Sequence, residues 1–271
     1  MSSQFFRDAA ALLETHPRLA LATVVSAVGS TPREAAARML VLPDGTARGT
    51  IGGGRFESLV IADATSLLAR SGLPFTKEYV FVPDGEDSFG AVCGGKAVVM
   101  LEIVERSPRL LVVGAGHCGR ALARAAAVTG FELTVCDERE DQLEPSAFPE
   151  GTRLVKVADD YADLPLPVPS DFVAVITRGH VTDGLALRRL RGAPVAYLGM
   201  MGSRAKRKAL YDELRAEGWG DEELARIACP IGLDIGAESP EEIAIAIVAE
   251  VIRMRRQVRA GTPTLTGVSQ P

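Results

Sequence analysis

The sequence is short of several kinds of residue, and each shortage argues against a class of protein. The longest apolar run covers residues 19–28, far less than the roughly 18 residues that a membrane-spanning helix needs. The four cysteines form no CxxC pair, and four in 271 residues do not suggest a disulfide scaffold. The three histidines form no HxxxH pattern, so we expect no metal site. Acidic residues outnumber basic ones, 35 to 30, which argues against nucleic-acid binding.

Aromatic residues are also scarce, at 5% of the chain, whereas there are 27 glycines. This balance favours small aliphatic packing and close backbone approaches, as in α/β proteins, over a β-sandwich with aromatic anchors. The chain is long enough for about two domains. We read no targeting signal at its start, and the cysteine usage suggests a reduced, cytoplasmic protein.

Residues 1–106 are expected to form the smaller, α+β domain. Helical periodicity is present over residues 4–14 and 55–70. Between and after them, β-like runs occupy residues 19–28, 38–42, 46–51, 79–82 and 97–104. Pro43-Asp44-Gly45 lies between two of these runs and predicts a hairpin.

Residues 107–258 are expected to form a Rossmann-like domain with a parallel sheet. The pattern changes after a short polar linker at residues 105–108, and apolar strands then alternate with helices, one of them from about Gly184. Such alternation predicts a sheet that is buried on both faces. Ser239-Pro240-Glu241-Glu242 predicts a capped start of the last helix. Residues 259–271, rich in Gly, Thr, Pro and Ser, are expected to be a disordered tail.

A glycine pattern, GAGHCG at residues 114–119, follows the first apolar strand of the second domain. Gly114 would allow a tight turn, Gly116 would let a pyrophosphate approach the backbone, and Gly119 would let helix and strand pack closely. The next strand ends in Asp137, about 20 residues on, where such sites place an acid for the ribose. We therefore predict a dinucleotide site formed by Gly114, Gly116, His117, Gly119 and Asp137.

The acid at position 137 favours NAD(H) over NADP(H), because a carboxylate repels a 2′-phosphate. Arg139 lies close by in the sequence and keeps NADP or another nucleotide open. A purely structural glycine turn, without a ligand, is the alternative interpretation.

The first domain contains a second glycine-rich loop, at residues 49–54, directly before a helix. Exposed amides at a helix start suit an anion, and the lack of a following Lys-Ser/Thr excludes a Walker A loop. Arg33 could grip a phosphate through two hydrogen bonds, and Glu57 is more simply a helix-dipole partner than a ligand. Cys93 is flanked by Gly94 and Gly95, so it is either an approachable thiol or a small buried residue.

Several motifs together resemble the XdhC/CoxI family of accessory proteins for xanthine dehydrogenase and related molybdenum hydroxylases. The resemblance covers nearly the whole chain in order. The motifs are GSTPR (29–33), GTIGGGRFE (49–57), FGAVCGG (89–95), GAGHCG (114–119), YLGMMGS (197–203) and IGLDIGAESPEEIA (231–244).

This resemblance implies a chaperone that binds molybdenum cofactor and delivers it, in sulfurated form, to an apo-hydroxylase. It suggests Cys93 as the cofactor-binding thiol, with Gly94, Gly95, Arg33 and the loop Gly52, Gly53 and Gly54 on the same surface. The implied partners are the apo-hydroxylase and a cysteine desulfurase, and a homodimer is expected.

Two other functions remain open on the residues alone. An NAD(P)-dependent oxidoreductase acting on a small molecule would use His180 as proton donor, although this explains only the second domain. A nucleotide-sensing regulator that docks to a partner is the third possibility. Since no convincing acid–base pair is present, we assign no catalytic residue, and a maturation factor is favoured over an enzyme.

Overall fold

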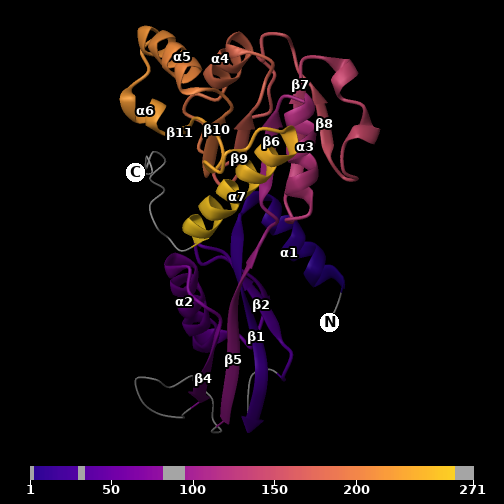
Figure 1. Cartoon of the computed structure of the whole chain (residues 1–271). Coiled ribbons are helices and arrows are strands. Elements are labelled where there is room, and N and C mark those ends of the chain that lie inside the picture. The colour runs from indigo at the N-terminus through magenta and orange to yellow at the C-terminus, as the bar shows by residue number, and fades with distance from the viewer. Residues whose placement is uncertain (1–2, 30–33, 82–94, 260–271) are drawn as a thin grey trace. The chain divides into compact units, whose positions relative to one another are not determined.

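The computed structural model describes residues 3–29, 34–81 and 95–259, and the chain forms two compact units that divide between Arg106 and Ser107 (Figure 1). The first unit contains an antiparallel sheet and the second a parallel sheet. This is the mixed α/β architecture that the sequence predicts, with a Rossmann-like second unit.

The first unit is built on five antiparallel strands in the order β3-β2-β1-β5-β4, with a helix on each face. The strands are β1 (Arg18–Gly29), β2 (Arg38–Val41), β3 (Ala47–Thr50), β4 (Phe75–Phe81) and β5 (Gly95–Glu105). The helices are α1 (Ser3–Thr15) and α2 (Gly54–Arg70).

Alternating side chains assign the two faces of this sheet. Ala20, Ala22 and Val24 of β1 are buried and pack in one cluster with Phe56 and Val60 of α2. On the other face, buried residues such as Leu19 and Leu40 contact α1. The expected hairpin between β2 and β3 is present, and Asp44 caps it by accepting a hydrogen bond from Thr46 N at 2.8 Å.

The second unit is a six-stranded parallel sheet in the order β11-β10-β9-β6-β7-β8. Its strands are β6 (Arg109–Val113), β7 (Glu132–Asp137), β8 (Arg153–Lys156), β9 (Phe172–Val175), β10 (Tyr197–Met200) and β11 (Ile227–Ala228). Its helices are α3 (His117–Ala127), α4 (His180–Arg189), α5 (Arg204–Ala216), α6 (Asp221–Ala225) and α7 (Pro240–Arg259), with short 3-10 turns at Glu140–Gln142 and Pro145–Ala147.

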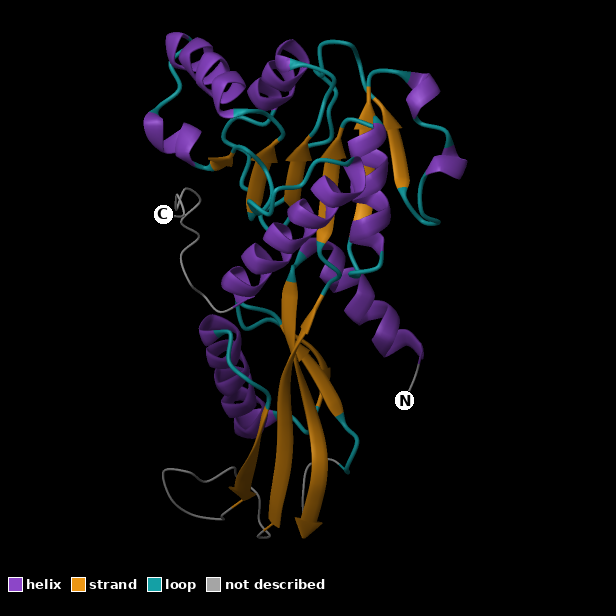
Figure 2. Cartoon of the chain, in the orientation of Figure 1, coloured by secondary structure: helices purple, strands orange, loops and turns teal. Residues whose placement is uncertain are grey.

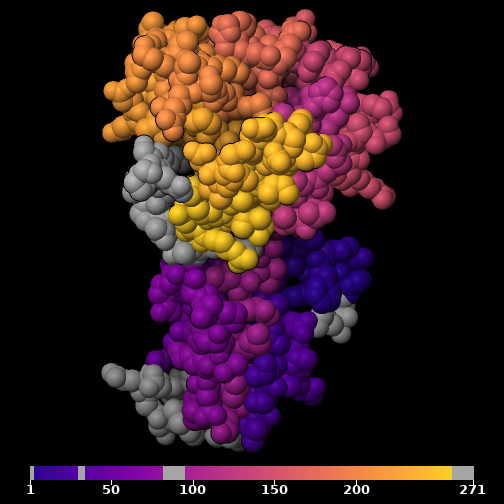
Figure 3. All heavy atoms as spheres, in the orientation of Figure 1, coloured from indigo at the N-terminus to yellow at the C-terminus, as the bar shows by residue number. Residues whose placement is uncertain are grey.

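Helices cover both faces of the parallel sheet (Figure 2). Side chains of α3 and α7 pack with alternate strand residues on one face, and those of α4, α5 and α6 pack on the other. The outer side of α7 remains on the surface, where the helix is visible in yellow (Figure 3). Ile245 of this helix is exposed. No helix among the described residues is long and apolar enough to cross a membrane.

The caps of α7 and α4 show where sequence patterns succeed and fail. Glu242 N donates to Ser239 Oγ at 3.3 Å and Ser239 N donates to Glu242 at 3.0 Å, which confirms the capping box. The predicted start of α4 was wrong, because the helix begins at His180 and not near Gly184. A Cβ at Gly184 would lie 2.6 Å from Arg188 Nη1 and 3.2 Å from a methyl group of Leu210, so this glycine occupies a crowded position inside the helix, facing α5.

Candidate functional site

The turn after β6 lies at the carboxyl edge of the parallel sheet, at the point where the strand order reverses. Within the sheet β6 has β7 on one side and β9 on the other. Open α/β sheets bind ligands in the crevice at such a reversal. The turn over residues 114–119 is therefore placed where a nucleotide-type ligand is expected.

The three glycines of this turn differ in what surrounds them. Gly114 has φ 119°, and a Cβ there would lie 2.1 Å from the carbonyl oxygen of Ile176. A Cβ at Gly119 would lie 1.9 Å from the carbonyl oxygen of Gly114. A Cβ at Gly116 would meet nothing within 4 Å. Two glycines thus serve backbone packing, while the middle one leaves open space beside the turn, as a bound pyrophosphate requires.

The start of α3 offers amide groups to this open space. Gly116 is the N-cap, and no side chain caps the helix there. The first N–H groups of a helix have no intrahelical acceptor, and the helix dipole makes that end partly positive. His117, the first helical residue, is exposed. The arrangement suits an anionic group, although it does not by itself identify one.

Asp137, at the end of β7, is completely buried and all its contacts lie within the protein. Its Oδ2 accepts from Ala115 N at 2.7 Å, and the Arg139 guanidinium contacts both carboxylate oxygens at 2.9 Å. Burial alone would raise the pKa of Asp137, but Arg139 and the Ala115 amide outweigh it and lower the pKa. Asp137 therefore fixes the glycine turn to the end of β7, and its role at a ribose stays a prediction.

A second buried acid at the same edge was not found from the sequence. Asp183, in the first turn of α4, forms an ion pair with Lys206 of α5 and accepts a hydrogen bond from Thr177 N at 3.3 Å. Asp183 is fully buried and Lys206 is partly exposed. His180 is exposed at the start of α4. Lys206 follows the YLGMMGS motif, which was recognised only by its resemblance to a family. No spacing between residues in the sequence predicts that Lys206 pairs with Asp183.

The glycine-rich loop of the first unit is arranged differently, because it encloses a carboxylate of its own. The backbone N–H groups of Ile51, Gly52 and Gly53 all donate to Glu57 Oε1, at 2.9, 3.1 and 2.8 Å. The Thr50 hydroxyl donates to the same oxygen. We refer to these four donors as the amide nest.

The amide nest keeps Glu57 ionised. Partial burial would raise the pKa of Glu57, but the hydrogen bonds from Thr50 and the loop amides lower it overall. The expectation that the amides of Gly52 and Gly53 face outward for an incoming anion therefore needs correction, since both donate inward to Glu57. The space next to Gly53 and Gly54 is nevertheless open, because a Cβ built at either residue would meet nothing within 4 Å.

Comparison with known families now adds to this geometry. The XdhC Rossmann domain matches residues 110–251, and the XdhC and CoxI family matches residues 12–79. The chain belongs to the XdhC and CoxI family. The two matches fall in the second and the first unit respectively.

Two curated proteins are similar in sequence to this chain. The uncharacterized protein YqeB of Escherichia coli is 37% identical over 258 residues, covering 94% of this chain and 47% of YqeB. A probable xanthine dehydrogenase subunit of Bacillus subtilis is 32% identical over 161 residues, covering 59% of this chain and 47% of that protein. The chain spans about half the length of the curated relatives it matches.

A solved structure shares the fold. The crystal structure of a xanthine dehydrogenase from Bacillus halodurans matches with a TM-score of 0.52 and 24% identity, covering 93% of this chain and 97% of that one. At this identity the likeness concerns the fold alone.

Strand ends that border two of the XdhC-type motifs lie at one end of the first-unit sheet. Gly29, which ends β1, is the register partner of Gly95, which begins β5 and also pairs with Phe81 at the end of β4. Strand β3 runs in the same direction as β1, but it ends level with the middle of β1, because Thr50 pairs with Arg38 and Arg38 pairs with Thr23. Arg33, Cys93 and Gly94 lie outside the described residues.

The three cysteines in the described part of the chain have raised pKa values, so their thiols stay protonated at neutral pH. Burial raises the pKa of Cys136 to about 12 and that of Cys229 to about 11. Burial also raises the pKa of Cys118, which is only half-buried. A raised pKa leaves little thiolate at neutral pH, and the thiolate is the form that binds metals. Among the described residues, no group of His, Cys, Asp and Glu is arranged to hold a metal ion.

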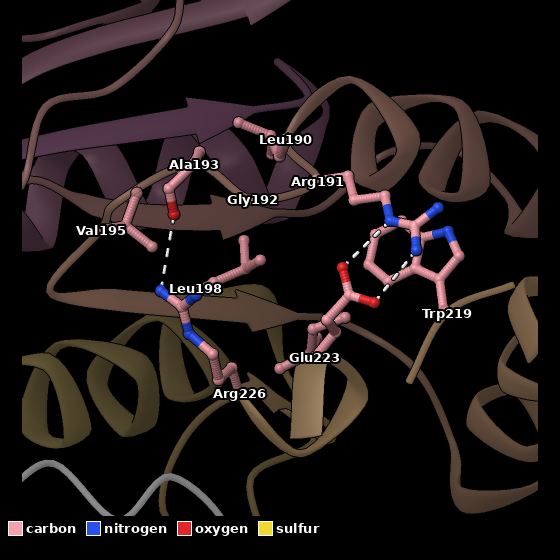
Figure 4. A pocket seen from close by; sticks show the side chains of 10 residues that line it. Leu190, Arg191, Gly192, Ala193, Val195, Leu198, Trp219, Glu223 and Arg226 are labelled. Carbon is pink, nitrogen blue, oxygen red and sulfur yellow. Dashed lines mark hydrogen bonds and ion pairs between the residues drawn. The ribbon is translucent and has the colours of Figure 1, made fainter. Parts of the chain in front are cut away.

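A pocket is present at the amino edge of the parallel sheet, opposite the edge that carries the glycine turn (Figure 4). It lies beside the loop after α4 and the start of β10, where Arg191 stacks on Trp219 and pairs with Glu223. Its volume of about 40 Å³ has room for a few water molecules but not for a cofactor. We therefore place no functional site there.

Proposed function

We propose that this chain is a maturation factor that binds molybdenum cofactor and delivers it, in sulfurated form, into xanthine dehydrogenase or a related molybdenum hydroxylase. Family membership supports this, as does the Bacillus subtilis relative, which is named as part of a probable xanthine dehydrogenase. The structural observation that carries it is the first-unit sheet, whose paired residues Gly29, Phe81 and Gly95 flank the segments that contain Arg33 and Cys93.

The chemistry of the first unit fits an anionic, sulfur-rich cargo. A thiolate at Cys93 is a soft ligand that suits a molybdenum centre better than a hydroxyl would. Arg33 and the glycines of positions 54, 94 and 95 would supply donors for the phosphate of the pterin, and the amide nest would join them only if Glu57 moved away. Because Glu57 already fills the nest, cargo phosphate would have to exchange with this side chain.

The decisive experiment replaces Cys93 by Ser, which is nearly the same size. After anaerobic purification, the variant is expected to lose most of its cofactor, measured as the fluorescence of the oxidised pterin, and to fail to activate apo-hydroxylase. Cys118→Ser is the matched control, since Cys118 is half-buried and its raised pKa makes it a poor ligand. If Cys93→Ser retained as much cofactor as the parent, the thiol would have no role in carriage.

The proposed partners follow from the same role. They are the apo-hydroxylase and a cysteine desulfurase that would supply the terminal sulfur, and the expected setting is the cytoplasm. A homodimer is expected as well. Co-purification of the tagged chain with each enzyme, and its mass in solution, test these points separately.

The second unit is proposed to bind NAD(P) in the open space beside Gly116, with Gly114, His117, Gly119 and Asp137 around it. The contrast between the crowded glycines, 114 and 119, and the open one, 116, supports this. Calorimetry with each dinucleotide tests it, and Gly116→Ala is expected to weaken binding without affecting the fold.

An NAD(P)-dependent oxidoreductase remains the second candidate function. The observation that favours it is the pair Asp183–Lys206 together with exposed His180, all following β9 or β10 at the carboxyl edge of the sheet. Such an enzyme would consume NAD(P)H continuously in the presence of a small carbonyl or imine substrate, and Lys206→Met would stop it. A carrier is expected to show no such turnover.

A further inference from the structure

Two acids and two arginines meet at the ends of β7 and β9, on either side of the glycine turn. Asp137 and Glu138 follow one another at the end of β7, and Arg139 comes next. Arg178 follows β9, and its Nε lies 3.2 Å from Glu138 Oε1. The Nε of Arg139 lies 3.7 Å from the same oxygen. Both guanidiniums thus lie within ion-pair distance of one buried carboxylate oxygen, which makes no hydrogen bond.

The four charges differ sharply in exposure. The side chains of Asp137 and Glu138 are 0% and 5% exposed, whereas those of Arg139 and Arg178 are 32% and 62% exposed. Glu138 is further tied down because its Oε2 accepts a hydrogen bond from the Tyr161 hydroxyl at 2.6 Å. The two buried carboxylates are therefore shielded from a ligand, whereas the two guanidiniums are not. The exposed acids Glu140 and Asp141 follow directly after Arg139 in the chain.

The exposed guanidiniums retain donors for a ligand. Arg139 donates its Nε–H and one N–H of Nη2 to Asp137. Three of the five N–H groups of its guanidinium are then left to donate to a ligand. Arg178 uses only its Nε side toward Glu138. Two neighbouring guanidiniums with free, planar N–H groups match the oxygens of a phosphate.

The position of the two guanidiniums relative to the glycine turn indicates which phosphate of a dinucleotide they would contact. In sheets of this topology the end of the second strand, here β7, lies at the adenosine ribose, where an acid reads the 2′-hydroxyl and an arginine reads a 2′-phosphate. We propose that Arg139 and Arg178 select nucleotides with a 2′-phosphate, so that the second unit prefers NADP(H) to NAD(H). This rests on the proposed binding of a dinucleotide by the same turn.

This inference reverses the expectation from sequence, where Asp137 favoured NAD(H). The sequence shows that an acid is present but not that its two oxygens are already used. Here they are occupied by Ala115 N and Arg139, so a ribose hydroxyl finds no free carboxylate at position 137.

Calorimetry on the full chain tests the proposal with NADPH and NADH, and with the fragments 2′,5′-ADP and 5′-AMP, which differ only in the 2′-phosphate. We expect each phosphorylated ligand to bind at least about tenfold more tightly than its counterpart. NADH binding as tightly as NADPH, or more tightly, would overturn the phosphate preference and leave dinucleotide binding intact. Binding of neither dinucleotide would overturn the proposed dinucleotide site itself.

Substitutions assign the preference to the two arginines. Arg178→Ala should weaken NADPH at least about fivefold while leaving NADH unchanged. Arg139→Ala should weaken NADPH and strengthen NADH, because Asp137 keeps its two backbone donors but gains a free face toward the ribose. Arg215→Ala, an exposed arginine on α5, is the matched control and should change neither affinity. An unchanged NADPH-to-NADH ratio in Arg178→Ala and in folded Arg139→Ala would exclude these residues as the readers.

Discussion

The two glycine-rich loops of this protein apply the same backbone chemistry with opposite outcomes. In the first unit, the amides before α2 converge on Glu57, a side chain from the first turn of that helix. In the second unit, an acid from the neighbouring strand takes only the Ala115 amide, and the start of α3 has no side-chain cap. One loop is capped by an acid of its own helix, and the other has no side-chain cap at its helix start.

This difference shows that a glycine-rich loop before a helix does not by itself define a binding site. What decides is whether a carboxylate lies within reach of the amides. Glu57 is placed four residues after Gly53, one helical turn away, and can fold back onto the loop. In α3 the corresponding early positions hold no acid. The predictions below test this contrast, from the largest expected effect to the smallest.

Gly119→Ala is expected to cost about 3 kcal/mol or more in the stability of the second unit, because its Cβ would collide with the Gly114 carbonyl oxygen. The single tryptophan, Trp219, is buried in this unit and reports its unfolding by denaturant. Gly116→Ala is the control, since its Cβ would meet open space and the midpoint should stay close to that of the parent. Equal midpoints for the two variants would contradict the assigned roles.

Glu57→Gln is expected to destabilise the first unit by about 1–3 kcal/mol, since it leaves loop amides facing a weaker acceptor. Hydrogen exchange of the amides at positions 51–53 should accelerate, and inorganic phosphate should protect them more strongly than in the parent. Trp219 emission serves as the control because it belongs to the other unit. Exchange rates equal to those of the parent would show that the nest does not depend on this carboxylate.

The contribution of Glu57 should depend on pH with a definite sign. The folded-state pKa of Glu57 lies below its ordinary value of 4.5, so its stabilisation is fully present above that value. It is lost as pH falls through the lowered folded-state pKa. The difference in unfolding free energy between parent and Glu57→Gln should therefore be constant near neutrality and shrink in acid. A difference that grew on acidification would refute the lowered pKa.

Arg191→Ala should have the smallest effect on the stability of the second unit. Its ion pair with Glu223 is solvent-exposed, and such pairs contribute little even with the added contact to Trp219. Trp219 emission should shift because the guanidinium leaves its ring, while dinucleotide affinity stays unchanged. Weakened dinucleotide binding would mean that the small pocket at this edge does contribute to function.

The sequence predicts the fold well where local signals and burial agree. Continuous apolar strands and the Ser239 cap describe short stretches whose structure depends on near neighbours, and the 114–119 turn has a spacing typical of its position in such a sheet. The prediction of the start of α4 was wrong because Gly184 resembles a helix boundary in the sequence. In the structure it lies inside α4 against Arg188 and against Leu210 of α5, and the second of these is 26 positions away in the sequence.

The candidate sites were predictable as residue types but not as contacts. Asp137 was found by its spacing, yet nothing local shows that its carboxylate faces inward to Arg139 and Ala115. The pair Asp183–Lys206 was missed for a similar reason, since α4 and α5 meet only in the folded unit. Burial and pairing of charges are tertiary properties, and they decide which side of an ion pair a ligand meets.

The carboxylate of Glu57 also changes what departure of a ligand from the first unit would cost. An anion that leaves ordinary backbone amides exposes donors that must find water or stay unsatisfied. In this loop Glu57 already accepts from all four donors, so they are hydrogen-bonded without any ligand. If an anion binds here as proposed, its departure would let Glu57 return to the same donors, and none of them would be left unsatisfied.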